Sequence, residues 1–521
     1  LSWATDSLPD ASVTAAKIAS GLQLATTDAQ NNVVVGLNAG DAFDGTNAER
    51  NVLIGTEAGT AITTGDRNIG IGLGALDTNT TGSYNVAIGD SALYTNSTAS
   101  NNVAVGNSAL LDNSTGSQCV AVGGYALENN TTASYNVAMG HNALATNTTG
   151  AGNVAIGDGV LVGNTTGATN TGLGHRALLA NTTGIENVSV GAYALDANTT
   201  ANWNTAVGYN ALSDNTTGQA NVAVGNWAAK ATTTGAYNTV IGQSAFQTNT
   251  TGNNNTAVGR QSLYANTTGA NNTAIGYAAL NANTTTHSCV GVGYQAGKSA
   301  TANYTTVVGD RAMSQATITG EHNTAIGHYS AANLTSGANN SAVGSNALAA
   351  NTTGTENVAV GSSALDANTT ASYNTAVGHE ALTANTTGHS NVALGRSALV
   401  SNTTANYNIG IGYKALGVNT TGTQNVAIGY EAAQLGSTTS YAACVGYKAL
   451  KNNTGNSNAA FGAYALEANT SGTRNTAVGY ASLDANTTSS DGTAVGCNAL
   501  GINTTGEQNA ALGSQSLAAN T

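Results

Sequence analysis

Apolar and polar positions alternate in a short unit that recurs along almost the whole chain. Each unit reads Asn-(Val/Thr)-Ala-(Ile/Val)-Gly, then an Ala-Leu pair, then Asn-Thr-Thr-Gly, as in residues 85–101. The glycine that closes the alternating stretch recurs 29 times, and from Gly72 to Gly293 it does so every 17 residues. A fixed period of this kind is typical of stacked identical units rather than of a globular domain.

The alternating stretch predicts a short strand. It has a period of two over four or five residues and is rich in β-branched side chains, such as Val86 and Ile88. The following glycine permits a tight bend, and Ala92-Leu93 forms a second short apolar segment. Asn-Thr-Thr-Gly, as at residues 79–82, makes the return turn, where Asn and Gly tolerate positive φ. A helix is excluded, because Gly, Thr and Asn would recur in every second turn.

Two short strands and two turns in 17 residues make one coil of a β-solenoid. We therefore predict an all-β fold, a parallel β-solenoid (β-roll) of about 29 stacked coils over residues 31–521. Residues 1–30 are expected to be an N-terminal linker or attachment segment. The coils at about 293–344 are the least regular, which indicates a decayed repeat more than a binding bulge. At about 4.8 Å per strand the stack would be a rod on the order of 140 Å long.

The core of one such coil is expected to be small. Val86, Ile88 and Leu93 are its large aliphatic side chains, with Ala87 facing away from Ile88 so that a second surface can approach. Burying each of them contributes about 1.5–3 kcal/mol, whereas ordering each residue costs about 1–2 kcal/mol. One coil cannot stand alone, and we expect chains to pack together, most plausibly three around an axis.

Composition and charge exclude several classes of protein. The chain has 13 basic and 26 acidic residues, a formal net charge of −13, and no basic stripe that would follow a phosphate backbone. We therefore expect no nucleic-acid partner. No apolar run approaches the length of a membrane span, so we expect no membrane insertion. The chain starts at Leu1 and stops at Thr521 inside a repeat, and we expect the gene product to extend beyond one or both ends.

Two of the four cysteines occupy a regular place in the repeat. Cys119 and Cys289 lie four residues before a repeat glycine, where Asn is usual, and they are ten repeats apart. That separation is far beyond disulfide reach within one chain. We interpret them as small buried thiols, with a link between neighbouring chains as the alternative.

The repeat resembles two families of fibrous proteins. Asn-Val-Ala-Ile-Gly followed by Ala, as in residues 85–92, resembles the repeat of trimeric autotransporter adhesin heads, which are trimers of parallel β-rolls on bacterial surfaces. The longer form with Asn-Thr-Thr-Gly resembles shaft repeats of phage tail fibres, and residues 12–18 are similar to a segment near the start of such shafts. The resemblance implies a homotrimeric fibre. The 17-residue coil is longer than the adhesin-head unit, so tail fibre and adhesin both stay open.

Candidate catalytic chemistry is absent from the repeat. Residues 70–74 mimic a dinucleotide-binding loop, but no helix follows, and the pattern arises where Gly replaces the strand Ala. The histidines form no cluster; several, including His141 and His175, fall in a variable slot after the repeat glycine. No pair of carboxylates recurs at one level, and no Asp-rich calcium repeat is present. We therefore predict no catalytic residue, no cofactor and no metal.

Exposed aromatic residues are the best candidates for surface recognition. One group lies directly after the repeat glycine: Tyr209, Tyr277, Tyr294, Tyr413, Tyr430 and Tyr480. The candidate recognition residues share a position five before the glycine: Tyr84, Tyr135, Trp203, Tyr237, Tyr373 and Tyr407. Such rings can pack on a sugar or on a neighbouring chain. The pattern favours a third role, as aromatic spacers between coils.

The Asn-Thr-Thr turn has three interpretations. It matches the N-glycosylation sequon, with Asn79, Asn96, Asn113, Asn147 and Asn198 as possible acceptors. Alternatively, the stacked Asn side chains bond to one another and to backbone, which we favour. The Thr-Thr pairs would suit an ice-binding array only on a strand face, whereas they sit beside the turn.

These observations predict a non-enzymatic structural fibre. It would be the rigid, elongated shaft of a phage tail fibre or of a cell-surface adhesin, extracellular or on a virion, and it would mediate attachment to a host-surface glycan or protein receptor. The alternative is an extracellular solenoid filament with a lateral glycan- or ice-binding surface, possibly glycosylated. An enzyme acting on glycans ranks last.

Overall fold

A computed structural model describes residues 26–43, 45 and 47–519, which form strands, turns and bends. These residues form a parallel β-solenoid of about 28 turns. The chain divides into two compact units, unit 1 (Leu1–Asn255) and unit 2 (Thr256–Thr521). The described residues contain no helix, and so none that is long and apolar enough to cross a membrane. Most of the segment predicted as an N-terminal linker, residues 1–30, lies outside the described residues.

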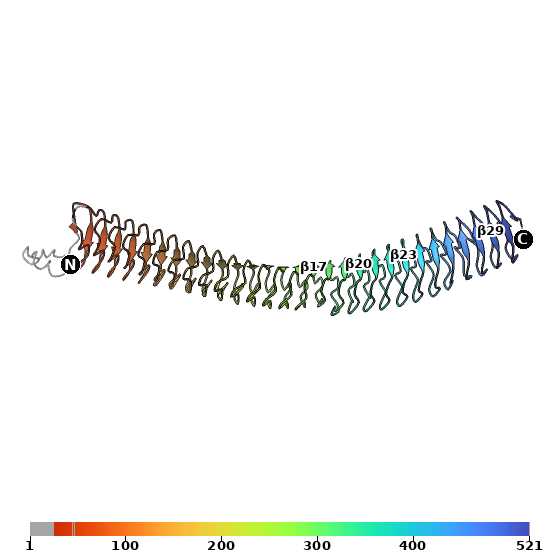
Figure 1. Ribbon diagram of the computed structural model, residues 1–521, viewed down its shortest axis with the longest axis horizontal. Coiled ribbons are helices and arrows are strands. Elements are labelled where there is room, and N and C mark those ends of the chain that lie inside the picture. The colour runs from red at the N-terminus through yellow and green to blue at the C-terminus, as the bar shows by residue number, and fades with distance from the viewer. Residues whose placement is uncertain (1–25, 44, 46, 520–521) are drawn as a thin grey trace, which may run out of the picture. The chain divides into compact units, whose positions relative to one another are not determined.

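Unit 1 contains a short N-terminal strand and thirteen solenoid strands of three residues each (Figure 1). They are β1 (Thr26–Thr27), β2 (Val33–Val35), β3 (Val52–Ile54), β4 (Ile69–Ile71), β5 (Val86–Ile88), β6 (Val103–Val105), β7 (Val120–Val122), β8 (Val137–Met139), β9 (Val154–Ile156), β10 (Thr171–Leu173), β11 (Val188–Val190), β12 (Thr205–Val207), β13 (Val222–Val224) and β14 (Thr239–Ile241).

Unit 2 repeats the same arrangement with sixteen strands. They are β15 (Thr256–Val258), β16 (Thr273–Ile275), β17 (Val290–Val292), β18 (Thr306–Val308), β19 (Thr324–Ile326), β20 (Ser341–Val343), β21 (Val358–Val360), β22 (Thr375–Val377), β23 (Val392–Leu394), β24 (Ile409–Ile411), β25 (Val426–Ile428), β26 (Ala443–Val445), β27 (Ala459–Phe461), β28 (Thr476–Val478), β29 (Thr493–Val495) and β30 (Ala510–Leu512).

Solenoid strands within each unit pair in parallel and in register, so that each residue lies beside its counterpart in the next coil. In β5 and β6, Ala87 pairs with Ala104, 17 residues later. Where the period changes, the register is kept: Ala443 pairs with Ala459 across a 16-residue interval. The turns therefore absorb the length changes, as the sequence predicts. Only β1 is antiparallel to its neighbour, β2.

Each coil contains one strand rather than the two that the sequence predicts. The Ala92-Leu93 segment is a turn in which Leu93 has a φ of 53°, a left-handed conformation that interrupts an extended strand. Its backbone is nevertheless bonded between coils, since the Leu93 N–H donates to the Ala109 carbonyl at 3.0 Å. Backbone ladders therefore hold the stack together outside the sheet as well as within it.

The expected inward face of the strand is wrong. Ala87 is fully buried in the lumen of the coil, whereas Val86 is half-buried and Ile88 is exposed. The same small-in, large-out pattern repeats in nearly every strand of both units. The lumen of such a coil already holds Leu93, Ala92 and two Asn side chains, so it leaves room for only a small residue at the strand centre. Val240 in β14 and Val307 in β18 are exceptions, since both are fully buried at the strand centre.

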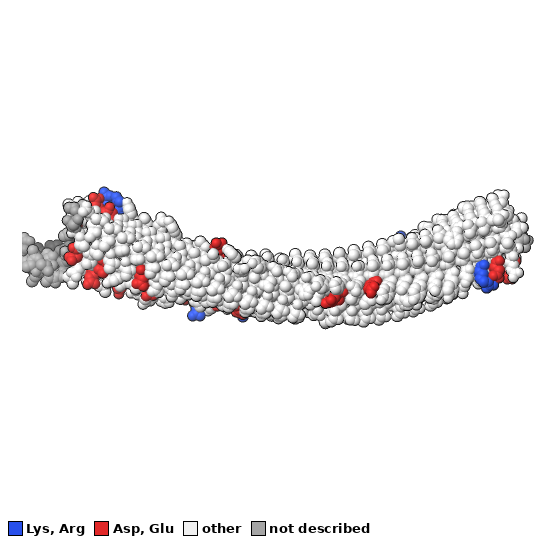
Figure 2. All heavy atoms as spheres, viewed as in Figure 1, with Lys and Arg blue, Asp and Glu red and all other residues white. Residues whose placement is uncertain are grey.

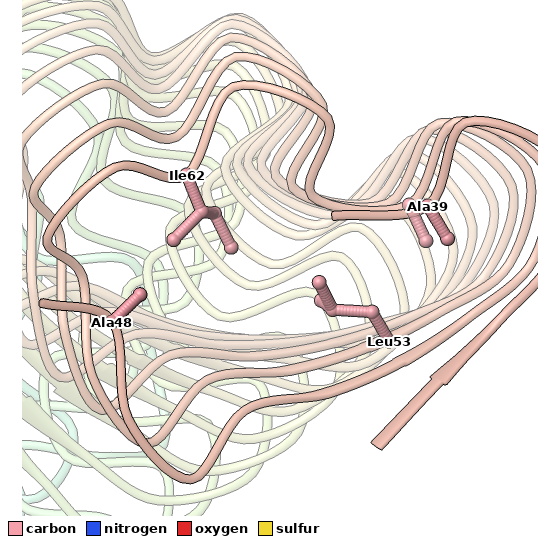
Figure 3. Packing of buried hydrophobic residues seen from close by; sticks show 5 residues of the cluster. Ala39, Ala48, Leu53 and Ile62 are labelled. Carbon is pink, nitrogen blue, oxygen red and sulfur yellow. The ribbon is translucent and has the colours of Figure 1, made fainter. Parts of the chain in front are cut away.

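The first coils show how the lumen is filled when a large residue does point inward. Leu53, at the centre of β3, packs with Ala48 and Ile62 inside the coil (Figure 3). Gly59 takes the place of the usual Leu there, and a Cβ at Gly59 would lie 2.8 Å from Leu53 Cδ2. The total volume is thus conserved by exchanging a large residue for a small one across the lumen.

Two columns of buried asparagines run through the lumen. In the strand column, Asn85 precedes β5; its backbone N–H donates to Asn68 Oδ1 at 3.0 Å, and its Nδ2 donates to the Ala99 carbonyl at 2.9 Å. In the turn column, Asn96 Nδ2 donates to Asn79 Oδ1 at 2.8 Å. These ladders satisfy polar groups that would otherwise be costly to bury.

Positive φ angles do not occur at the turn where the sequence places them. Within a coil they belong to the repeat glycine, to the second and fourth residues after it, and to the residue before the strand Asn, as in Tyr84 (φ 60°). Asn79 and Gly82 are not among them. Gly82 is required for a different reason: a Cβ there would lie 2.3 Å from the Ala99 carbonyl oxygen of the next coil.

Coils 293–344 keep the strand register of their neighbours through β17 to β20. Apolar side chains replace the turn asparagines there: Ala300, Ile318 and Leu334 are all fully buried. The irregularity is therefore a change of lumen filling inside a continuing repeat.

Candidate functional site

The outward face of each strand carries a continuous row of aliphatic side chains, here called the strand-face stripe. It consists of the last strand residue before each repeat glycine, such as Ile88, Ile156 and Leu173. Its exposed members are between 36% and 45% exposed, apart from Leu512 of β30, the last strand, which is 84% exposed. Contiguous exposed apolar surface of this kind is typical of an interaction face.

The six candidate recognition aromatics all lie at the surface. We call the position that they share, directly before the strand Asn, the pre-strand column. Tyr84, Tyr135, Trp203, Tyr237, Tyr373 and Tyr407 are between 51% and 64% exposed. No two of them lie in adjacent coils, so the fold aligns them without bringing them into contact.

Most of these rings contact a polar or aromatic neighbour in an adjacent coil. The Arg67 guanidinium lies 5.1 Å from the centre of the Tyr84 ring and donates to its hydroxyl. Trp203 Nε1 donates to Glu186 Oε2 at 3.1 Å. The His389 and Tyr407 rings meet edge to face at 5.0 Å. Such contacts suit spacers between coils, although each ring keeps half of its surface free.

One shallow depression involves the pre-strand column. Thr370, Ala371, Ser372, Tyr373, Thr387 and His389 line it. No Asp, Glu, Lys or Arg is among these lining residues, so the depression offers little beyond ring faces and hydroxyl groups.

The second aromatic group forms denser contacts than the first. We call the first or second residue after the repeat glycine the post-glycine column. In unit 2, Tyr277 and Tyr294 stack at 5.3 Å, and further along Tyr413 and Tyr430 stack at 5.1 Å. Arg311 lies over Tyr294 at 5.4 Å and donates to the Tyr329 hydroxyl at 2.9 Å.

Several members of this column are not among those named from the sequence. They are Tyr447 and the aromatic residues two positions after a repeat glycine, namely Tyr125, Tyr193, Trp227, Tyr329 and Tyr464. Tyr447 directly follows a repeat glycine, so the position alone identifies it. Tyr464 lies two residues after Gly462, and its ring nevertheless contacts that of Tyr447, which lies one residue after its own glycine. Residues at the first and second positions after the glycine therefore share one column. Nothing in the repeat pattern indicates that a residue two positions after the glycine belongs to this column.

Charge is sparse on the surface and differs between the units. Figure 2 shows acidic and basic side chains as isolated spots on a mostly uncharged face. Unit 1 has 5 basic and 16 acidic residues, a formal net charge of −11, whereas unit 2 has 8 and 10, a net charge of −2. In the post-glycine column of unit 1, Asp158 lies between His141 and His175, with N–O distances of 3.5 and 3.1 Å.

The sequon asparagines are not available for modification in the folded chain. Asn79, Asn96, Asn113, Asn147 and Asn198 are all fully buried. Each Nδ2 donates to the carbonyl three residues later, as from Asn79 to Gly82 at 2.9 Å. A glycan on that nitrogen would have no room in the lumen. The arrangement favours the interpretation of the turn as an asparagine ladder and argues against glycosylation at these positions.

The threonines of the same turn do not form a free hydroxyl array. Thr80 Oγ1 donates to the Ser97 carbonyl of the next coil at 3.0 Å, and this bond recurs along the stack. The second threonine, Thr81, is exposed beside the turn.

Titratable groups are scattered over the described residues. Within the described chain no three His, Cys, Asp or Glu residues are placed to hold a metal ion. Burial raises the pKa of Asp196, and the nearby Asp214 carboxylate adds to that shift.

The cysteines behave as the sequence predicts. Cys119 and Cys289 are free and fully buried, and each Sγ contacts a backbone carbonyl of the next coil, at 3.4 Å from Ala133 O and 3.1 Å from Ala302 O. They fill the strand asparagine slot as small apolar groups. Burial raises the pKa of both thiols.

Comparison with protein-family models and with curated proteins yields no match for this chain.

Proposed function

We propose that this chain is a structural fibre protein, the shaft of a phage tail fibre or of a cell-surface adhesin that mediates attachment. The observation that carries the proposal is the in-register stacking of equivalent residues at a 17-residue period within each unit. Such a stack gains length with each repeat, and its interior is filled by Leu, Ala and Asn side chains. A rigid spacer needs these properties, and a catalyst does not.

The strand-face stripe supports assembly of several copies of the chain. The stripe recurs once per coil, so a partner that covers it along a whole unit must have the same rise per repeat. A second copy of this chain meets that condition without any adjustment. The Val, Ile and Leu side chains of the stripe would then be buried at the interface, each contributing about 1.5–3 kcal/mol. The family resemblance suggests three copies around one axis.

Location and receptor follow from the same proposal. A shaft of this kind would stand outside a cell or on a virion and hold a distal binding region toward a host-surface glycan or protein. Genes for phage structural proteins beside this one would favour the tail fibre over the adhesin. We propose no catalytic role.

The mass of the intact chain in solution tests the assembly. Light scattering coupled to gel filtration should give three times the 51.3 kDa of one chain. A mass of 51.3 kDa at micromolar concentration would contradict self-association through the stripe.

The alternative function is binding of glycans or of ice along the side of the solenoid, and of these two, glycan binding has more support. The first threonine of each turn is committed to a backbone carbonyl, and the strand face mixes Thr with aliphatic residues. The post-glycine column, in contrast, gathers partly exposed tyrosines with cationic side chains.

A further inference from the structure

The longest run of aromatic contacts in the described chain lies in unit 2, and we call it the tyrosine ladder. Its members come from five successive coils: Tyr413, Tyr430, Tyr447, Tyr464 and Tyr480. Successive ring centres are 5.1, 5.2, 5.3 and 5.8 Å apart. The first three rings stack, with interplanar angles of 26° and 13°, and the last two turn by 73° and 83°.

The ladder stays open to solvent. Tyr430, Tyr447 and Tyr480 are 43%, 41% and 55% exposed. Stacked rings cover the faces of one another, so the stack presents ring edges and hydroxyl groups, whereas the turned rings of Tyr464 and Tyr480 break this pattern. A row of phenol groups that recurs once per coil, with ring centres 5.1–5.8 Å apart, can donate to and accept from an extended ligand along its length.

Cationic side chains flank the ladder. The Arg396 guanidinium lies 5.7 Å from the centre of the Tyr413 ring, and Lys414 Nζ lies 5.3 Å from it. Lys448 Nζ lies 5.1 Å from the centre of the Tyr447 ring. None of these three cations forms an ion pair with another described residue, whereas Lys451 pairs with Glu431 at 2.8 Å.

The local charge is opposite to that of the whole chain. Residues 396–480 contain five basic and two acidic residues, a formal net charge of +3, in a chain of net charge −13. Two of these basic residues are already paired, Lys451 with Glu431 and Arg474 with Asp491, and Arg474 lies directly before the strand residue Asn475 rather than in the ladder. The cations that remain beside the exposed phenols are Arg396, Lys414 and Lys448. This surface suits a ligand that carries regularly spaced anions together with hydroxyl groups and ring faces.

We propose that the tyrosine ladder binds a linear anionic polysaccharide that lies along the column, with its carboxylate or sulfate groups at Arg396, Lys414 and Lys448. The spacing of the phenols is close to the length of one sugar residue, so successive sugars meet equivalent groups in successive coils. A nucleic acid fits less well, because the remainder of the chain is acidic and would repel its continuous phosphate backbone.

This site deepens the proposed attachment function but does not depend on self-association. The ladder lies in the turn after the repeat glycine, and the strand-face stripe lies on the strand. Loss of polysaccharide binding and loss of assembly are therefore separate results, since the first is read from affinity and the second from mass.

Binding of the full chain to immobilised polygalacturonate, dextran sulfate and uncharged dextran tests the proposal. We expect binding to the two anionic polymers that weakens as salt rises, and none to dextran. The two anionic arms distinguish carboxylate from sulfate as the preferred group. Equal binding to dextran, or tighter binding to single-stranded oligothymidylate, would overturn the proposal.

Serine substitutions identify the site, because serine occupies the same positions at Ser362 and Ser363. The variant Arg396→Ser/Lys414→Ser/Lys448→Ser should weaken binding by about tenfold or more, and Tyr430→Ser/Tyr447→Ser should do the same. The matched control is Arg176→Ser/Tyr209→Ser in unit 1, which changes the same two positions after the repeat glycine and should bind as the unaltered chain does. Unchanged affinity in both ladder variants would overturn the proposal.

A measurement on the unaltered chain avoids any effect of substitution on folding. Tetranitromethane nitrates exposed tyrosines, and mass spectrometry locates the modified residues. Polygalacturonate should protect Tyr430, Tyr447 and Tyr480, and should leave the exposed Tyr84 and Tyr135 reactive. Equal nitration of the ladder with and without the polymer would overturn the proposal.

Discussion

Asparagine is the residue that makes this coil possible. Its side chain both donates and accepts, so one residue type satisfies itself when it is stacked, as Asn96 does on Asn79 at 2.8 Å. The turn column of asparagines depends on an Asn in each coil. Where Thr232 replaces the turn Asn, the Asn215 Oδ1 has no hydrogen-bond partner. A carboxylate in the same column would place acceptors against acceptors.

We predict that Asn187→Asp destabilises unit 1 by about 3–5 kcal/mol. Asn187 Nδ2 donates to Asn170 Oδ1 at 3.1 Å and to the Ala201 carbonyl at 2.9 Å, and an oxygen in its place would face both acceptors. Urea unfolding followed by circular dichroism measures the loss. Asn187→Cys is the control, because Cys119 occupies this slot naturally, and it should cost only about 1–3 kcal/mol. Equal losses would contradict the ladder.

Gly89→Ala should be more damaging than Gly124→Ala. Gly89 has a φ of 141°, and a Cβ there would lie 2.3 Å from the Gly106 carbonyl oxygen of the next coil. At Gly124 the nearest atom would be His141 Cδ2, at 3.7 Å. We expect a loss of at least about 1–3 kcal/mol for the first and a change within about 0.5 kcal/mol for the second. Thermal unfolding of both variants measures the difference, and a reversed order would refute the close approach of coils.

The Cys444 thiol gives a pH-dependent prediction. Burial raises its pKa to about 12 in the folded chain, from 9.0. Between pH 9 and 12 the unfolded chain loses a proton that the folded chain keeps. Stability is therefore complete below pH 9 and falls above it, by about 1.4 kcal/mol per pH unit. Cys444→Ala, which restores the usual strand residue, should remove this component when urea unfolding of the two chains is compared across that pH range.

The strand is the element that the sequence predicted best in position and worst in orientation. The alternation of Val86, Ala87 and Ile88 correctly places a strand at β5, although the strand is three residues long rather than the four or five expected. Alternation defines two faces without saying which is inside, and the larger side chains were wrongly placed in the core. The lumen size that decides the matter depends on Leu93 and its left-handed turn, which no local pattern in the repeat indicates.

Ile156→Glu should therefore disrupt self-association and leave the coil intact. Ile156 lies in the strand-face stripe of β9, whereas its neighbour Ala155 is fully buried. We expect circular dichroism to be unchanged and the mass by light scattering to fall. Ala155→Leu is the opposite case: it overfills the lumen, costs about 1–3 kcal/mol of stability, and should not act through the stripe. An unchanged mass for Ile156→Glu would exclude the stripe as the interface.

The candidate surface sites were predicted as columns but not as contacts. Position in the repeat correctly aligned Tyr84 with Tyr135, and Tyr413 with Tyr430, at the surface. Which rings touch depends on whether adjacent coils both carry an aromatic residue and on the conformation of the turn between them. The tyrosine ladder is continuous only because Tyr447 and Tyr464 lie in the post-glycine column between Tyr430 and Tyr480.

At the scale of the whole molecule, successive repeats add length to each unit. Parallel pairing of strands adds about 4.8 Å of length per coil in each unit, and this length is independent of any ligand that the chain binds. A globular enzyme of the same size would instead close its chain around one core. Self-association side by side would increase the mass without shortening the particle.

Small-angle X-ray scattering of the intact chain tests this claim most directly. The rod on the order of 140 Å that the repeat predicts would give a skewed pair-distance distribution with a long tail. A compact particle of 521 residues would instead have a radius of gyration of about 24 Å and a symmetric distribution. The skewed curve would support a shaft built by stacking, and the symmetric curve would contradict it.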